Sequence, residues 1–155
     1  MLVKTYGSAV YGINATTITI EVNISQGVNF FLVGLPDSAV KESQQRIDAA
    51  LKNNGFKIPG KKIVINMAPA DIRKEGSAYD LPLAVGILAA SEQIKFDKVG
   101  DYIIMGELSL DGNLQAIKGF ALVGGLASCI FAGADISDDD LEIFIHAVTI
   151  SRKSA

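Results

Sequence analysis

The clearest pattern in the chain is a strict alternation of apolar and polar residues over positions 17–24. In an extended chain, every second side chain lies on the same face of the sheet, so this pattern gives one apolar face and one polar face. The apolar positions are Ile18, Ile20, Val22 and Ile24. The pattern predicts a strand that buries this face against a core.

Three other segments have the composition of strands. Residues 3–10 form a weaker strand pattern, and residues 30–33 are Phe-Phe-Leu-Val. Because only a short turn separates 17–24 from 30–33, we expect these two strands to be antiparallel neighbours. Residues 62–67 are rich in β-branched residues, as in a central strand, and Pro69 ends that strand because it lacks a backbone donor.

A helix is predicted to begin at Asp37 or Ser38, because either side chain can accept hydrogen bonds from the free amides of a first helical turn. Apolar residues recur on one face, whereas charged residues such as Arg46 are assigned mostly to the other faces. Gly55 is suited to end the helix. The apolar face consists of Val40, Ile47, Ala50 and Leu51.

A second helix is predicted over residues 81–90, which are apolar on every side. This composition is typical of a helix packed inside a domain, and we expect Asp80 to cap it, a structural role. Beyond it, residues 102–105 and 108–110 predict one or two strands, with a hairpin turn leading into residues 113–117. The mixed order of strands and helices predicts an α+β domain, a mixed sheet with helices packed on it.

Composition sets limits on the function. The chain has 155 residues, 49% of them hydrophobic, which fits one domain with its own core. A net charge of -3 argues against nucleic-acid binding by bulk charge, although a local basic patch remains open. Lys57, Lys61 and Lys62 form the one basic cluster, which we interpret as solubilising charges rather than a DNA track. The start of the chain lacks a secretory pattern, so we expect a cytoplasmic protein.

Metal and membrane chemistry receive no support from the sequence. Cys129 and His146 are the single residues of their types, and both sit in apolar runs, so we interpret them as packed residues rather than metal ligands. Residues 119–134 form the longest uncharged stretch, about 16 residues against the roughly 20 that a bilayer requires. We therefore expect no metal site and no membrane contact.

Six motifs occur in order along the first 119 residues. They are Tyr-Gly-Ser-Ala-Val at 6–10, Phe-Leu-Val-Gly-Leu-Pro-Asp at 31–37, Val-Lys-Glu-Ser at 40–43, Asn-Met-Ala-Pro-Ala-Asp at 66–71, Lys-Glu-Gly-Ser-Ala-Tyr-Asp-Leu-Pro at 74–82 and Gly-Glu-Leu-Ser at 106–109. Together they resemble the N-terminal domain of the ComM/YifB-type magnesium-chelatase-related AAA+ ATPases. The resemblance covers residues 1–119 and implies the fold of the second domain of ribosomal protein S5, shared with the proteolytic domain of Lon. Residues 120–155 are taken as the remainder of the same domain, although they depart from the family pattern.

The resemblance also implies a function. In the proteins that this chain resembles, the domain precedes an ATPase module, and the ComM members are hexameric motors that act on DNA during natural transformation. The chain contains no Gly-x-x-x-x-Gly-Lys-Ser/Thr loop, so it is not expected to hydrolyse ATP by that route. We predict a non-catalytic accessory domain that helps to assemble the ring or to engage DNA or another substrate. ATP and Mg²⁺ belong to the implied full-length protein, and the implied partners are its AAA+ module, further copies in a hexamer and DNA.

Two alternatives stay open. A Lon-like peptidase needs a serine hydroxyl beside a lysine whose pKa is lowered by burial. When the Lon pattern Lys-Asp-Gly-Pro-Ser-Ala-Gly is laid on residues 74–80, the nucleophile falls on Ala78 and the lysine near Ala121, so only a displaced dyad of Ser77 and Lys118 would remain. The other alternative is a purely structural oligomerisation domain.

The candidate binding residues lie in the loop before the second helix. Arg73, Lys74 and Glu75 are three consecutive charged residues, and arginine and lysine bind phosphates as readily as carboxylates. These three residues are candidates for contact with DNA or with a neighbouring subunit. The alternative is a solvated surface loop without a partner.

Overall fold

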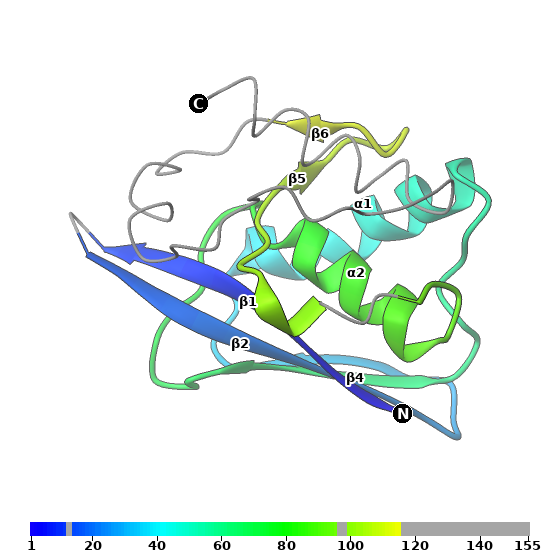
Figure 1. Cartoon of the computed structure of the whole chain (residues 1–155), viewed down its shortest axis with the longest axis horizontal. Helices are drawn as coiled ribbons and strands as arrows, with labels where there is room; N and C mark the ends of the chain where they lie inside the picture. The colour runs from blue at the N-terminus through cyan, green and yellow to red at the C-terminus, as the bar shows by residue number, and fades with distance from the viewer. Residues whose placement is uncertain (12–13, 96–98, 116–155) are drawn as a thin grey trace.

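The computed structural model describes residues 1–11, 14–95 and 99–115. A four-stranded sheet lies on one side, two helices cover one of its faces, and a short hairpin lies beyond the helices (Figure 1). In chain order the elements are β1 Leu2–Tyr11, β2 Asn14–Ser25, β3 Phe30–Val33, α1 Ser38–Asn53, β4 Lys62–Ala68, α2 Asp80–Ala90, the 3-10 turn η1 Val99–Asp101, β5 Glu107–Leu108 and β6 Leu114–Gln115. This arrangement confirms the predicted α+β class with a mixed sheet and helices packed on it.

The order of strands in the sheet is β1-β2-β4-β3. β2 is antiparallel to both β1 and β4, whereas β3 and β4 are parallel. The prediction that β2 and β3 are antiparallel neighbours is therefore wrong, because α1 carries the chain back so that β4 enters between them. A parallel pair needs a crossover of this kind. β4 takes a central place in the sheet, as predicted for residues 62–67.

The alternating pattern in β2 has the predicted consequence. Ile18, Ile20 and Val22 are fully buried and Ile24 nearly so, and these side chains face α2 and the rest of the core. Gly86 allows α2 to lie close to this strand, because a Cβ atom there would come within 2.6 Å of Val22 Cγ2. The core thus forms between the inner face of the sheet and the two helices.

The predicted start and buried face of α1 are confirmed. Asp37 is the N-cap, and its Oδ1 accepts a hydrogen bond of 2.8 Å from the backbone amide of Val40. The four predicted apolar residues are all fully buried. The helix ends at Asn53, just before the predicted Gly55.

The second helix, α2, is buried on nearly every side, as predicted, but Asp80 does not cap it. The N-cap is Tyr79, which makes no side-chain capping bond, and Asp80 is the first helical residue. The capping prediction is wrong because the Asp80 carboxylate has stronger partners across the core, described below. Its structural role stands.

The region after α2 contains less strand than predicted. Residues 102–105 form no strand, and their only ladder contact is an isolated bridge between Ile103 and Tyr6. The hairpin turn is confirmed, since β5 and β6 pair antiparallel on either side of residues 109–113. Lys118, Cys129, His146 and the whole of residues 120–155 lie outside the described residues. Within the described ranges, no helix is long and apolar enough to cross a membrane.

Candidate functional site

The loop between β4 and α2 is held in place by Lys74. Its side chain is fully buried, and Nζ donates hydrogen bonds to the carbonyl oxygens of Gly34, at 2.7 Å, and Pro69. The Lys74 main chain also pairs with the segment after β3: its amide donates to Leu35, and its carbonyl accepts from the amide of Asp37. Lys74 therefore cannot serve as the surface contact that the sequence predicted. It fastens the loop to the β3–α1 connection.

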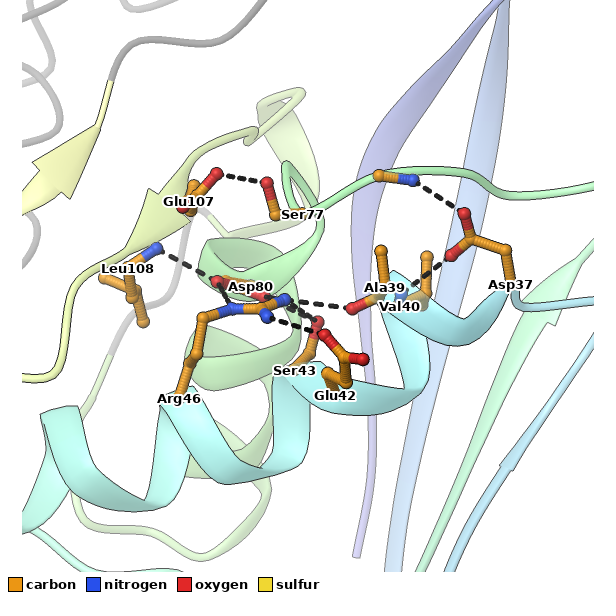
Figure 2. A network of polar contacts seen from close by, with 11 residues as sticks. Asp37, Ala39, Val40, Glu42, Ser43, Arg46, Ser77, Asp80, Glu107 and Leu108 are labelled. Carbon is orange, nitrogen blue, oxygen red and sulfur yellow. Dashed lines mark hydrogen bonds and ion pairs between the residues drawn. The ribbon is translucent and has the colours of Figure 1, made fainter.

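Gly34 makes this fastening possible. Its φ of +102° lies in the region that favours glycine, and an added Cβ would stand 2.2 Å from the Met67 carbonyl oxygen. Asp37 adds a further tie, since its Oδ2 accepts from the Gly76 amide at 3.1 Å while Oδ1 caps α1 (Figure 2). The loop is thus anchored to the start of α1 as well as to the end of β3.

Burial lowers the pKa of Lys74, and the nearby charge of Asp71 partly opposes this effect. When an ammonium group is removed from water, hydrogen bonds to carbonyl oxygens replace part of the stabilisation that its hydration provided. The two carbonyl partners explain how a lysine can be placed here at all.

The neighbours of Lys74 in the loop point outward. Arg73 and Glu75 have side chains that are 65% and 64% exposed, and Arg73 Nε lies 3.1 Å from Glu75 Oε1. An exposed pair of this kind contributes about 0–1 kcal/mol, so a partner could replace it at little cost. The binding role predicted for these two residues stays a prediction, and they are presented on an anchored loop.

A buried ion pair lies behind this loop. Asp80 is fully buried, and its carboxylate makes two bonds to Arg46, Nε to Oδ2 at 2.7 Å and Nη2 to Oδ1 at 2.9 Å (Figure 2). The hydroxyl of Ser43 donates to Oδ1 at 2.5 Å, and the amide of Leu108 donates to Oδ2 at 3.1 Å. Hydrogen bonding to Asp80 raises the pKa of the Arg46 guanidinium. The network joins α1, α2 and β5.

Sequence reasoning missed this network. The helical pattern places Arg46 off the apolar face, yet only 20% of its side chain is exposed, and its Nη2 also donates to the Ala39 carbonyl at 2.9 Å. The signal was the spacing of Ser43 and Arg46, three residues apart at the border of the apolar face. Two hydrogen-bonding residues at that border indicate a buried polar partner on a facing element.

Ser77 lies at the edge of the same region. Its hydroxyl donates to the carboxylate of Glu107, a residue of the sixth motif to which sequence reasoning gave no role of its own (Figure 2). Lys118, the other member of the displaced dyad, lies outside the described residues, so the pairing of Ser77 with Lys118 stays a prediction. The buried lysine that the structure does describe, Lys74, directs its Nζ to carbonyl oxygens instead.

The carboxylates of this region do not fit a magnesium site. Both oxygens of Asp80 accept bonds from protein groups, and both oxygens of Asp37 accept backbone amides. In the described part of the chain, no three His, Cys, Asp or Glu residues gather where a metal ion could be held.

Comparison with known proteins decides the family. The family model described as subunit ChlI of Mg-chelatase matches residues 20–128, which is more than half of the chain. The chain belongs to this family. It is 49% identical over 112 residues to the uncharacterized protein YifB of Escherichia coli and 47% identical over 115 residues to the competence protein ComM of Haemophilus influenzae. An uncharacterized protein of Mycobacterium tuberculosis is 35% identical over 117 residues.

These matches cover most of this chain but a minor part of each relative. The YifB match takes in 72% of the chain and 22% of the relative, the ComM match 74% and 23%, and the mycobacterial match 75% and 23%. The chain therefore spans less than a quarter of the length of these ChlI-family relatives. The segment that matches includes the anchored loop, Ser77 and the Asp80–Arg46 pair.

Proposed function

We propose that this chain forms the N-terminal accessory domain of a magnesium-chelatase-related, ComM-like AAA+ ATPase and that it acts by binding. Family membership supports this proposal, and the remaining length of the relatives leaves room for the ATPase module. The domain would help to assemble the ring or to engage DNA or another substrate. ATP and Mg²⁺ would act in that module, in a cytoplasmic assembly of several copies, up to a hexamer.

The observation that carries the proposal is the use of polar residues in the segment 74–80. Lys74 is committed to two carbonyl oxygens, Asp80 to Arg46, and Ser77 to Glu107. A hydrolytic site needs a nucleophile with a base in reach, whereas these residues hold the loop and the helix in place. What the arrangement offers to solvent is the pair Arg73 and Glu75.

The finer fold assignment belongs to the same proposal. We infer the fold of the second domain of ribosomal protein S5, shared with the proteolytic domain of Lon. The antiparallel pair β1 and β2, joined through β4 to a parallel β3–α1–β4 unit, supports this assignment. Under this assignment, the chain shares its architecture with the proteolytic domain of Lon but acts by binding rather than by cleavage.

Binding to DNA is tested with the purified chain and a labelled single-stranded oligonucleotide. If the loop contacts phosphates, affinity should fall steeply between about 50 mM and 200 mM salt, and Arg73→Ala should weaken binding and reduce the magnitude of the salt slope by about 1. Lys52→Ala is the matched control, because Lys52 is an exposed cation on α1 that also pairs with an acidic neighbour. No binding even at low salt would eliminate DNA and leave ring assembly, another substrate or the purely structural oligomerisation domain.

The peptidase alternative has its own test. We expect a serine-reactive fluorophosphonate probe to leave Ser77 unlabelled, because its hydroxyl bonds a carboxylate and no lysine among the described residues reaches it. Mass spectrometry of the labelled chain would locate any adduct, with Ser77→Ala as the control. Labelling at Ser77 that disappears in Lys118→Ala would establish the displaced dyad and overturn the proposal.

A further inference from the structure

Two consecutive asparagines at the end of α1 hold the β5–β6 hairpin. Asn53 Nδ2 donates to the carbonyl oxygen of Leu110 at 2.7 Å, and Asn54 Nδ2 donates to that of Asp111 at 2.9 Å. The hairpin turn therefore lies beside the last turn of the helix (Figure 1). These two side chains, here called the asparagine clip, tie the turn to a helix that ends 57 positions earlier in the chain.

The surroundings of Asn54 require an amide. Its Nδ2 also donates to the carbonyl oxygen of Ala50 at 2.8 Å, and the hairpin approaches so closely that a Cβ atom at Gly112 would stand 2.2 Å from Nδ2. Both acceptors of Nδ2 are main-chain carbonyl oxygens. The amide nitrogen of asparagine supplies two N–H donors, whereas a carboxylate supplies none. The asparagine clip thus depends on Asn54 remaining an amide.

The residue that follows makes this amide chemically vulnerable. Gly55 has no side chain to shield its main-chain nitrogen, and asparagine is among the thermolabile residues. The Gly55 nitrogen can attack Asn54 Cγ and close a succinimide ring. The N–Cγ bond forms, the Cγ–Nδ2 bond breaks, and the side-chain nitrogen leaves as ammonia, with the proton of the Gly55 amide transferred through solvent. Water then opens the ring at either carbonyl and gives aspartate or isoaspartate.

The folded chain restrains this reaction. The Gly55 amide donates to the Lys52 carbonyl at 3.3 Å, and both N–H groups of the Asn54 side chain have acceptors. Ring closure requires the side chain to leave those acceptors and the Gly55 amide to leave Lys52. The reaction therefore needs a local opening in which the hairpin turn separates from the end of the helix.

We propose that Asn54 is a site of spontaneous deamidation, that the docked hairpin gates the reaction, and that the product releases the hairpin from α1. After conversion, a carboxylate faces the carbonyl oxygens of Ala50 and Asp111, so two hydrogen bonds are lost and like partial charges repel. Release also loosens β5, whose residues bond Ser77 and Asp80. The modification is independent of the proposed role beside an ATPase.

The gating is tested by comparing the folded full chain with the same chain unfolded in guanidinium chloride, both in mildly alkaline buffer. Trypsin releases the peptide 53–57, and mass spectrometry locates the modified residue. We expect conversion at Asn54 in both samples, at least about ten-fold slower in the folded chain. Asn53 is the internal control, because a residue with a side chain follows it. Asn53→Ala removes one bond of the asparagine clip and should speed conversion of the folded chain alone.

The consequence for the hairpin is tested by hydrogen exchange. Asn54→Asp carries the carboxylate of the product, and we expect exchange of residues 107–115 to quicken about ten-fold or more while β2 stays protected. Asn23→Asp is the matched control, because it makes the same charge change at an exposed residue of β2. Wild-type chain that has been aged until Asn54 is converted should exchange as the Asn54→Asp variant does.

Four results would overturn the proposal. Equal conversion rates in the folded and unfolded chains would show that the hairpin does not gate the reaction. An Asn54 that stays unmodified in either sample would show that it is not such a site. Unchanged exchange of residues 107–115 in Asn54→Asp, or loss of protection in β2 as well, would show that the asparagine clip does not hold the hairpin locally. None of these measurements involves DNA or ATP, so failure here is distinguishable from failure of the proposed function.

Discussion

Asp80→Ala is expected to destabilise the chain by about 3–5 kcal/mol, the usual cost of removing one partner from a buried ion pair. The substitution leaves the guanidinium of Arg46 largely buried without its carboxylate, and it also removes acceptors from Ser43 and from the Leu108 amide. Because a domain of this size has a free energy of unfolding of about 5–15 kcal/mol, this loss is a large fraction of the total. Urea denaturation followed by circular dichroism measures the loss.

Two further variants separate charge from packing. Replacing both partners in Asp80→Leu/Arg46→Met should recover much of the loss, because apolar residues of similar volume remove the unpaired charge. Asp48→Ala is the matched control: Asp48 pairs with Lys52 at 2.6 Å, but both side chains are exposed, so we expect less than about 1 kcal/mol. Equal losses in Asp80→Ala and Asp48→Ala would show that burial of the Asp80–Arg46 pair has no energetic consequence.

The contrast between Asp37 and Asp80 shows what local sequence can and cannot predict. Periodicity located β2 and α1, and apolar composition located β4 and α2, because each element depends on which of its own residues avoid water. The Asp37 cap was also predictable, since a cap depends only on the next three residues. Asp80 followed the same local logic and gave a wrong cap, because its partners come from α1 and β5, which only the packed fold brings near.

The prediction that β2 and β3 are neighbours was wrong for a related reason. The short turn between β2 and β3 suggested a hairpin, but the insertion of β4 depends on the path of the chain through α1, which no local pattern contains. The same holds for Lys74. A charged residue in a loop is expected to be solvated, and its burial depends on carbonyl groups of Gly34 and Pro69 that lie in two separate connections. Motif resemblance identified the family and the loop, whereas the role of each residue in the loop required coordinates.

The last prediction concerns Lys74 and the way that the loop is held. Lys74→Met keeps a long side chain but removes the donor to the carbonyl oxygens of Gly34 and Pro69, and we expect a loss of about 1–3 kcal/mol at neutral pH. The loss should be accompanied by release of the segment that carries Arg73 and Glu75. Hydrogen exchange of residues 69–76 would detect that release, while the core of β2 should remain protected.

The pH dependence of the same variant gives a sharper test. Burial places the pKa of Lys74 in the folded chain below its ordinary value of 10.5, so the unfolded chain binds more protons in the window between the two values. Stability conferred by this group therefore rises as pH increases through that window, and Lys74→Met lacks the contribution. The difference in unfolding free energy between wild type and Lys74→Met should widen as the pH rises toward 10.5, whereas Lys52→Met, at an exposed lysine, should show no such widening. A constant or narrowing difference would mean that the Lys74 ammonium is solvated, and the anchored loop would lose its main support.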